Sequence, residues 1–139
     1  MRAYEIDSSQ IKYFMGQLLL SDVFGQWCLF QGKIRIFCDF TIDGRWNENW
    51  DGDNGSYIKW ERIRPYLVQI IKGKQTPDYM KIVLLRQDDC GIGYLNISYE
   101  GQKLQLTTTY QPKEFMLDHS MEQEFCQKTE EFLKDNQII

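Results

Sequence analysis

Hydrophobic residues recur along the chain at two spacings, and the changes between these spacings predict the order of helices and strands. A short strand is expected at residues 3–6. Asp7 follows as a helix cap with Gln10 three residues on, which is a capping-box pattern. Apolar side chains then recur at helical spacing: Ile11, Phe14, Met15, Leu18 and Leu19. This pattern predicts a helix over about residues 8–20.

The next segment, residues 26–46, has the period-two alternation of β-strands. The dipeptide Gln31-Gly32 is typical of a turn between two strands. After it, apolar side chains alternate with mostly polar ones, and the apolar members are Ile34, Ile36, Cys38, Phe40 and Ile42. The pattern predicts a hairpin whose second strand has one inward face.

A second helical pattern covers residues 60–71, with apolar side chains at Trp60, Ile63, Leu67, Ile70 and Ile71. Pro65 lacks an N–H group, and proline is tolerated only in the first turn of a helix. The regular part of this helix is therefore expected to begin near 61–64 unless the helix kinks there. Gly73 is expected to end this helix, with Pro77 shortly beyond it.

The remaining chain alternates in period two and then returns to helical spacing. Strands are expected at 79–87, 93–101, 102–111 and 114–117, with a glycine-containing turn between the middle two. Ser120 is expected to cap a closing helix, whose apolar stripe is Met121, Phe125, Cys126, Thr129, Phe132 and Leu133.

The predicted order is β-α-β-β-α-β-β-β-β-α, which indicates an α+β fold. We expect one domain over residues 1–139, with a mostly antiparallel sheet, two helices packed on it and a C-terminal helix. Repeated crossover helices are missing from this order, which disfavours a doubly wound α/β fold. The chain has two halves, each a helix followed by strands, and this element order resembles the single-domain unit of DNA sliding clamps. Such a resemblance concerns fold and not function.

Composition and charge narrow the class of protein. The chain has 139 residues, 42% of them apolar and 26% charged, which is typical of a soluble globular domain. Its net charge of −4 gives no global attraction to nucleic acid or to an anionic membrane. The N-terminal residues lack the apolar core of a signal peptide, and no window approaches 18 apolar residues, so we expect a cytoplasmic protein without a membrane partner.

The four cysteines are spaced without a CxxC pair: Cys28, Cys38, Cys90 and Cys126. We interpret them as reduced, buried thiols that act as small hydrophobic side chains.

Candidate chemistry is concentrated in the loop IDGRWNENWDGDNG at residues 42–55. A calcium EF-hand loop that starts at Asn47 would need a bidentate Glu at its twelfth position, where Ile58 stands. No cofactor or bound metal is therefore expected. An irregular metal-dependent enzyme site stays an alternative, with carboxylates from Asp43, Glu48, Asp51 and Asp53. Trp46 and Trp50 either form a stacking platform or fold back over the edge of the sheet.

Catalytic motifs are missing elsewhere. The only histidine, His119, lies between Asp118 and Ser120, and neighbours in sequence do not form a triad, whose members meet through the fold. The chain contains no P-loop, GxSxG or HExxH, and the GIG at residues 91–93 precedes a strand. This absence favours a non-catalytic binding or scaffolding domain over an enzyme.

One regional charge signal remains between residues 59 and 86, where seven cations face two acids, Glu61 and Asp78. This segment predicts contact with an anionic partner, either nucleic acid or an acidic protein. The alternative is a solvated helix face paired with the acidic loop. The candidate ligand-binding residues are Arg45, Trp46, Trp50, Trp60, Arg62, Arg64, Lys72 and Lys74. A homodimer formed through edge strands or the apolar terminus at 136–139 stays open as a third reading.

A set of short motifs also resembles a family of small bacterial proteins, from clostridia and relatives, that carries only a domain-of-unknown-function label. The matching motifs are Phe40 with Ile42-Asp43-Gly44-Arg45, Trp60 with Ile63-Arg64-Pro65, Ile71-Lys72-Gly73-Lys74 with Thr76-Pro77, and Leu95-Asn96-Ile97. The resemblance covers nearly the whole chain and implies a bacterial, cytoplasmic, stand-alone domain. It implies no catalytic residue.

Overall fold

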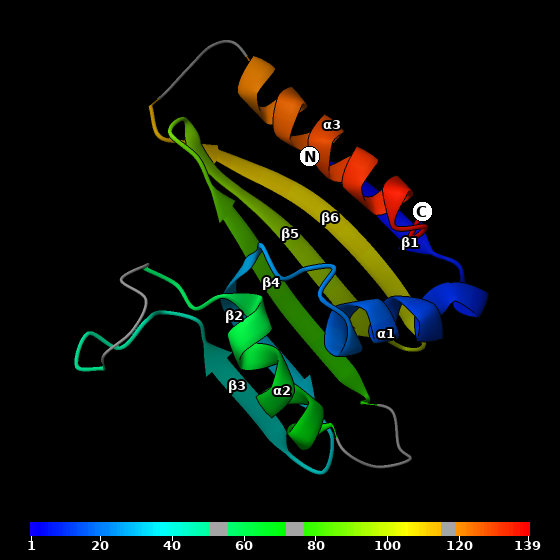
Figure 1. Ribbon diagram of the computed structural model, residues 1–139. Coiled ribbons are helices and arrows are strands. Elements are labelled where there is room, and N and C mark those ends of the chain that lie inside the picture. Colours follow the sequence, from blue (N-terminus) through cyan, green and yellow to red (C-terminus); the bar gives the residue numbers. More distant parts are fainter. Residues whose placement is uncertain (51–55, 72–76, 115–118) are drawn as a thin grey trace.

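The computed structural model describes residues 1–50, 56–71, 77–114 and 119–139 (Figure 1). In this part of the chain the strands are β1 (Arg2–Ile6), β2 (Cys28–Arg35), β3 (Asp39–Asp43), β4 (Tyr79–Gln87), β5 (Gly91–Glu100) and β6 (Lys103–Pro112). The helices are the short 3₁₀ helix η1 (Ser8–Gln10), α1 (Ile11–Leu20), α2 (Trp60–Ile70) and α3 (Ser120–Asp135).

All the strands join one antiparallel sheet in the order β1-β6-β5-β4-β2-β3. The β4-β5-β6 meander forms its centre. β1 adds to one edge beside β6, and the β2-β3 hairpin adds to the other edge beside β4. The structure therefore confirms the predicted α+β class and the antiparallel sheet.

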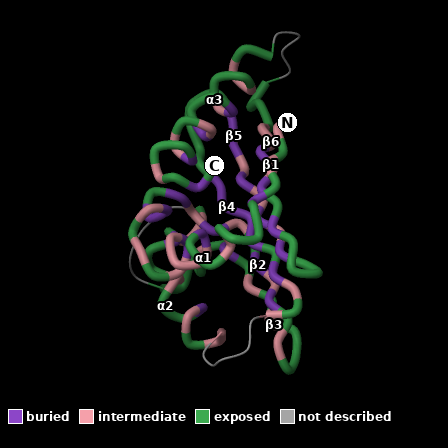
Figure 2. The backbone as a smooth tube through the Cα atoms, turned by 90° about the vertical axis from the view of Figure 1, so that its right-hand side faces the viewer, coloured by how far each residue is buried: buried purple, intermediate pink, exposed green. Residues whose placement is uncertain are grey.

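The three α-helices lie on the same face of the sheet, and the opposite face carries no helix among the described residues (Figures 1 and 2). α3 packs along β6, while α1 and α2 pack on each other, and α2 also contacts β2. The molecule therefore has two layers, a helix-covered face that holds the core and a helix-free face. We keep these two names below.

The core lies between the helices and the inward residues of the strands. Ile34, Ile82, Leu84, Leu95, Ile97 and Leu106 point into it from the sheet, and none is more than 1% exposed. An aromatic chain continues the core, because Phe24 contacts Phe132 edge to face with ring centroids 5.4 Å apart, and Trp27 contacts Phe125 at 6.2 Å. Gly93 makes room for this chain, since a Cβ atom there would overlap the Phe125 ring of α3.

The β2-β3 hairpin turns at a different place from the predicted one. Gln31 and Gly32 lie inside β2, and the turn is formed by residues 36–38, where the Ile36 N–H donates to the Cys38 carbonyl. Arg35 pairs with Asp39 directly across this turn, and their side chains form an ion pair at 2.8 Å. This local ion pair gives the later turn a stabilising contact that the Gln-Gly dipeptide lacks.

Despite this shift, Ile34 and Phe40 still lie on the same face, as predicted, because they pair with each other across the shorter turn.

The interpretation of the cysteines as buried is wrong for two of them. Cys38 is exposed because it lies in the turn, and Cys90 is exposed in the connection before β5, whereas Cys126 is buried in α3.

The helix ends also differ in detail from the predictions. The first helix begins with η1, and Asp7 accepts from the Ser9 N–H rather than forming a capping box with Gln10. α2 begins at Trp60 and continues through Pro65, which sits on its exposed side, where solvent can reach the carbonyl left without a donor. His119 occupies the cap position of α3, and Ser120 is its first residue. Gly73 lies outside the described residues, as does the predicted strand at 114–117 except Glu114, which lies in a bend.

Candidate functional site

Two hollows flank the end of β3, and both include Asp43 and Arg45. The first, which we name the tryptophan groove, has a volume of about 350 Å³ and is lined by Arg45, Trp46, Trp50, Ile58, Arg62 and Tyr66 among others. The second, which we name the lysine hollow, has a volume of about 520 Å³ and is lined by Phe30, Lys33, Arg45, Tyr57, Tyr79 and Lys81 among others. The Ile-Asp-Gly-Arg motif thus stands at the border between them.

The local structure of this motif explains its residue types. The Asp43 carboxylate accepts a hydrogen bond from the Arg45 N–H at 2.9 Å, which closes a tight turn. Gly44 passes so close to the neighbouring strand β2 that a Cβ atom at this position would overlap the Leu29 carbonyl. The Gly44 N–H donates to the Phe30 carbonyl at 3.0 Å. Only glycine fits there, and the turn places Arg45 between the two hollows.

Backbone contacts hold the loop that carries Trp46 and Trp50 beside this turn. Arg45 pairs with Tyr57 in an isolated antiparallel bridge, and the Trp46 N–H donates to the Ser56 carbonyl at 3.0 Å. The Asn47 side chain accepts from the Asn49 N–H at 3.1 Å, so this residue acts as a turn-former. The Trp46 indole N–H reaches the Trp50 carbonyl at 3.4 Å. The described part of the loop is therefore folded back on itself.

Cations and exposed rings meet in the tryptophan groove. The Arg62 guanidinium lies over the Trp46 ring, 5.0 Å from its centroid, which is the geometry of a cation–π contact. Trp50 and Tyr66 line the same groove and are 69% and 67% exposed. Four of the predicted ligand-binding residues, Arg45, Trp46, Trp50 and Arg62, are therefore brought together.

Other predicted residues lie elsewhere. Trp60 is completely buried, and its indole N–H donates to the Leu18 carbonyl at 2.8 Å. Arg64 donates to the Leu19 carbonyl at 3.3 Å and forms an ion pair with Asp22 at 3.0 Å. Both residues fasten α2 to α1 and are occupied by these contacts. Lys72 and Lys74 lie outside the described residues.

The basic segment 59–86 does not form one charged face in the described part of the chain. Arg86 lies over the ring of the core residue Trp27 at 5.3 Å, Lys81 points to the helix-free face, and Arg62 faces the tryptophan groove. These three cations therefore do not share one binding surface.

The lysine hollow contains residues that the sequence alone did not single out. Lys33 of β2 and Lys81 of β4 occupy directly paired positions in neighbouring strands, and Thr41 of β3 faces Lys33 from the other side. Phe30 contacts the rings of Tyr57 and Tyr94 at 5.6 and 5.4 Å. Burial raises the pKa of Tyr94, and the neighbouring Tyr57 adds to the increase. The alternation within each strand predicts which of its side chains share a face. The sequence alone does not predict that β2 and β4 are neighbours, and this pairing is what brings Lys33 and Lys81 together.

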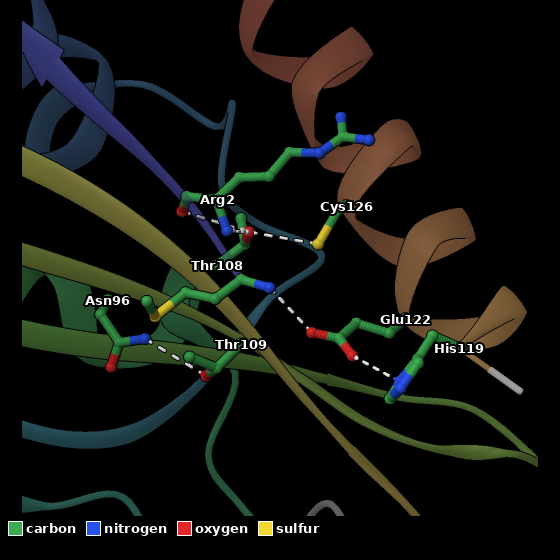
Figure 3. Close-up of polar contacts among 8 residues, drawn as sticks. Arg2, Asn96, Thr108, Thr109, His119, Glu122 and Cys126 are labelled. Carbon is green, nitrogen blue, oxygen red and sulfur yellow. Dashed lines mark hydrogen bonds and ion pairs between the residues drawn. The ribbon is translucent and has the colours of Figure 1, made fainter. Parts of the chain in front are cut away.

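The candidate metal and catalytic groups do not assemble in the part of the chain that the structure describes. No group of three or more His, Cys, Asp or Glu side chains able to hold a metal occurs there, while Asp51 and Asp53 lie outside it. His119 is exposed and lies 3.4 Å from the Glu122 carboxylate at the start of α3 (Figure 3). Nearby, the Thr108 hydroxyl contacts the Cys126 sulfur at 3.3 Å and ties β6 to α3 (Figure 3). These are contacts within the fold.

Comparison with known proteins places the chain in a family. The model of DUF5721, a family of unknown function, matches residues 17–91 and 85–139. No curated protein and no solved structure matches the chain, and neither comparison supports the predicted resemblance to sliding clamps. None of the described helices is both long enough and apolar enough to cross a membrane. The chain belongs to the family of unknown function DUF5721.

Proposed function

We propose that this protein is a non-catalytic binding domain whose tryptophan groove holds a single-stranded nucleic acid. The observation that carries the proposal is the Arg62 guanidinium over the Trp46 ring, next to the exposed rings of Trp50 and Tyr66. Bases stack on aromatic side chains and on guanidinium planes, while arginines neutralise the phosphates. The groove supplies both kinds of contact.

The exposure of the two rings supports a partner. A soluble domain gains free energy when it buries large apolar side chains, about 25 cal/mol for each Å² removed from water. Trp50 and Tyr66 stay mostly exposed and therefore lack most of this stabilisation, and both line the same groove. Exposed aromatic side chains that gather beside arginines are typical of residues that dominate a binding interface.

The charge of the groove favours weak, salt-sensitive binding. Arg45 and Arg62 line it together with Asp43, whose carboxylate already accepts from the Arg45 N–H. If two phosphates are neutralised, the logarithm of the binding constant should fall with the logarithm of the salt concentration with a slope of about −1.4. The net charge of −4 keeps long-range attraction low. We therefore expect affinity to come largely from stacking.

An acidic protein is the competing anionic partner. Carboxylate side chains would pair with Arg45 and Arg62, but they would leave the Trp50 and Tyr66 rings without a stacking partner. A nucleic acid uses the rings and the cations together, and this is why we favour it.

The test is fluorescence anisotropy of a short labelled oligothymidylate at low and moderate salt. Wild type should bind, and Trp50→Ala should weaken binding by roughly tenfold, because one base–aromatic stack contributes about 1–3 kcal/mol. Arg62→Ala should weaken binding and also make the salt dependence shallower. A labelled polyglutamate peptide in the same assay tests the acidic protein.

Two matched controls come from the same chain. Phe37→Ala removes an aromatic ring that is 87% exposed at the β2-β3 turn, and Arg86→Ala removes an arginine of the same basic segment that lies over Trp27. Both should bind like wild type. The proposal is overturned if the oligonucleotide does not bind at low salt, or if Trp50→Ala and Phe37→Ala behave alike. Binding of polyglutamate alone would assign the groove to an acidic protein.

A further inference from the structure

We infer that the lysine hollow on the helix-free face is a separate binding site for the phosphate group of a small phosphorylated molecule, because two directly paired lysines and Arg45 line it together with only one carboxylate, that of Asp43. This site goes beyond the tryptophan groove. It shares Asp43 and Arg45 with the groove, and it differs from the groove in its two lysines, in the size of its ligand and in its test.

The paired lysines are the first step of the argument. Directly opposite residues of an antiparallel pair have Cβ atoms about 5 Å apart, and like charges in such positions destabilise the sheet. Lys33 and Lys81 occupy these positions in β2 and β4, near the middle of their pairing. A dianion between the two ammonium groups would turn this repulsion into attraction.

Neighbouring acids neutralise the pair only in part, through one long ion pair of Lys33. The nearest carboxylate to Lys33 is that of Asp39, at 3.8 Å, but Asp39 is already held by Arg35 at 2.8 Å. The Arg35 hydrogen bond holds the pKa of Asp39 below its ordinary value. In the described part of the chain, Lys81 has no ion pair with any carboxylate. Lys81 is thus exposed, charged and available to an anion.

Residues with hydroxyl groups flank the lysines in the same cross-strand row. Thr41 pairs with Lys33, and Ser98 of β5 pairs with Lys81, so the row reads Thr-Lys-Lys-Ser across four strands. Tyr57 and Tyr79 line the hollow as well. Hydroxyl groups donate to phosphate oxygens, and lysines serve as point charges for phosphate.

The size and walls of the hollow indicate the rest of the ligand. Its volume of about 520 Å³ falls within the range of small-molecule sites, about 300–1,000 Å³. Phe30, Tyr57 and Tyr79 contribute aromatic rings to its lining. A carboxylate carries one negative charge, whereas a phosphate monoester carries nearly two and matches the lysine pair better. We therefore assign the site to a small phosphate monoester that also carries a planar or apolar group.

The experiment uses phenyl phosphate as the probe, with inorganic phosphate and benzoate for comparison at constant ionic strength. Phenyl phosphate should raise the Tm of the wild type in a saturable way, because a ligand bound only by the native state stabilises it. Inorganic phosphate should bind more weakly, since it makes no contact with the rings. Amide NMR shifts should concentrate at Gly32, Lys33, Thr41 and Lys81.

The variant Lys81→Met gives a paired readout. It should raise the Tm without ligand, because the like-charge contact is gone, and it should weaken phenyl phosphate binding by about tenfold, since hydrogen bonds to charged groups contribute about 1.5–3 kcal/mol each. Lys103→Met is the matched control, a lysine at the start of β6 that does not line the hollow. It should leave the affinity unchanged.

Three outcomes would overturn the inference: no saturable shift with either phosphate, equal affinity of wild type and Lys81→Met, or benzoate that binds as tightly as phenyl phosphate. Lys81 and Lys33 do not line the tryptophan groove. Oligothymidylate binding should therefore persist in Lys81→Met, so that the small-ligand site and the proposed function can fail independently.

Discussion

The two faces of the sheet are built from the same strands but meet different surroundings. In β4, Met80, Ile82 and Leu84 point to the helices and are at most 1% exposed, whereas Lys81 between them points the other way and is exposed. Because successive side chains of a strand alternate between faces, one residue step separates the core from the lysine hollow. The helix-covered face holds the buried core, and the helix-free face presents exposed, charged side chains such as Lys81.

The helix-free face is itself divided. Val83 and Leu85 lie on it, yet they are only 4% and 3% exposed, and the ring cluster of Phe30, Tyr57 and Tyr94 occupies the neighbouring positions. At this end the sheet buries apolar residues without a helix. The lysine hollow adjoins the ring cluster through Phe30 and Tyr57. Apolar and cationic side chains therefore meet on this face.

The largest expected effect tests the difference between the faces with neighbouring residues. Ile82→Ala should lower the free energy of unfolding by about 3 kcal/mol, because it removes buried methyl groups and leaves a cavity beneath the helices. Lys81→Ala should leave it unchanged or raise it slightly, since the side chain is exposed and faces Lys33. Urea unfolding midpoints measure both.

A comparable loss of stability in the two variants would contradict the placement of Ile82 in the core and of Lys81 on the exposed face of the sheet. The m-values should stay equal to that of the wild type, which shows that the variants change stability and not the extent of unfolding.

The fold followed largely from hydrophobic spacing, and its errors have local causes. Strands at 79–87 and in the following hairpin were predicted because their alternation is uninterrupted. The prediction for the first hairpin is wrong because Gln31-Gly32 has the composition of a turn, whereas the observed turn lies at residues 36–38, with the Arg35–Asp39 ion pair across it. Residue types indicate where a turn is favoured, and cross-strand contacts decide between nearby alternatives.

The candidate site was predictable only where its residues are close in sequence. Trp46 and Trp50 drew attention as neighbours in one loop, and the structure places Arg62 beside them. Trp60 was included although it belongs to the apolar stripe of its helix, a pattern that predicts the burial now observed. Lys33 was missed because its pairing with Lys81 joins strands that are distant in sequence.

The second prediction concerns the glycine at the border of the two hollows. Gly44→Ala should lower the free energy of unfolding by about 2 kcal/mol, because its Cβ atom would overlap the Leu29 carbonyl and force the backbone apart. The shift should also displace Arg45 and weaken oligothymidylate binding. Thermal unfolding and anisotropy measure the two effects.

Gly32→Ala is the matched control for that variant. A Cβ atom at Gly32 would have its nearest neighbours at 3.9 Å, an ordinary contact distance, so stability and binding should stay close to wild type. If the two alanine variants behaved alike, the close approach at Gly44 would not be what positions the Ile-Asp-Gly-Arg turn.

The smallest expected effect lies on the helix-covered side, at the end of β6. The Tyr110 ring packs 5.8 Å from that of Phe125, and its hydroxyl donates to the Asp88 carboxylate at 3.3 Å. Burial, followed by the negative charge of Asp88, raises the pKa of Tyr110 from 10.0 to about 12. Between these values the unfolded chain releases the phenolic proton while the native protein keeps it.

The native state then binds more protons than the unfolded state, so the free energy of unfolding should fall as the pH rises from about 10 to about 12. For a phenol near the surface the loss should be less than about 1 kcal/mol, because solvent screens the charge. Urea midpoints measured across this range should decline less steeply in Tyr110→Phe than in wild type. Parallel pH curves for wild type and Tyr110→Phe would show that the solvation of the phenol changes little on folding. The helix-covered face would then be more accessible to solvent at this end than at its centre.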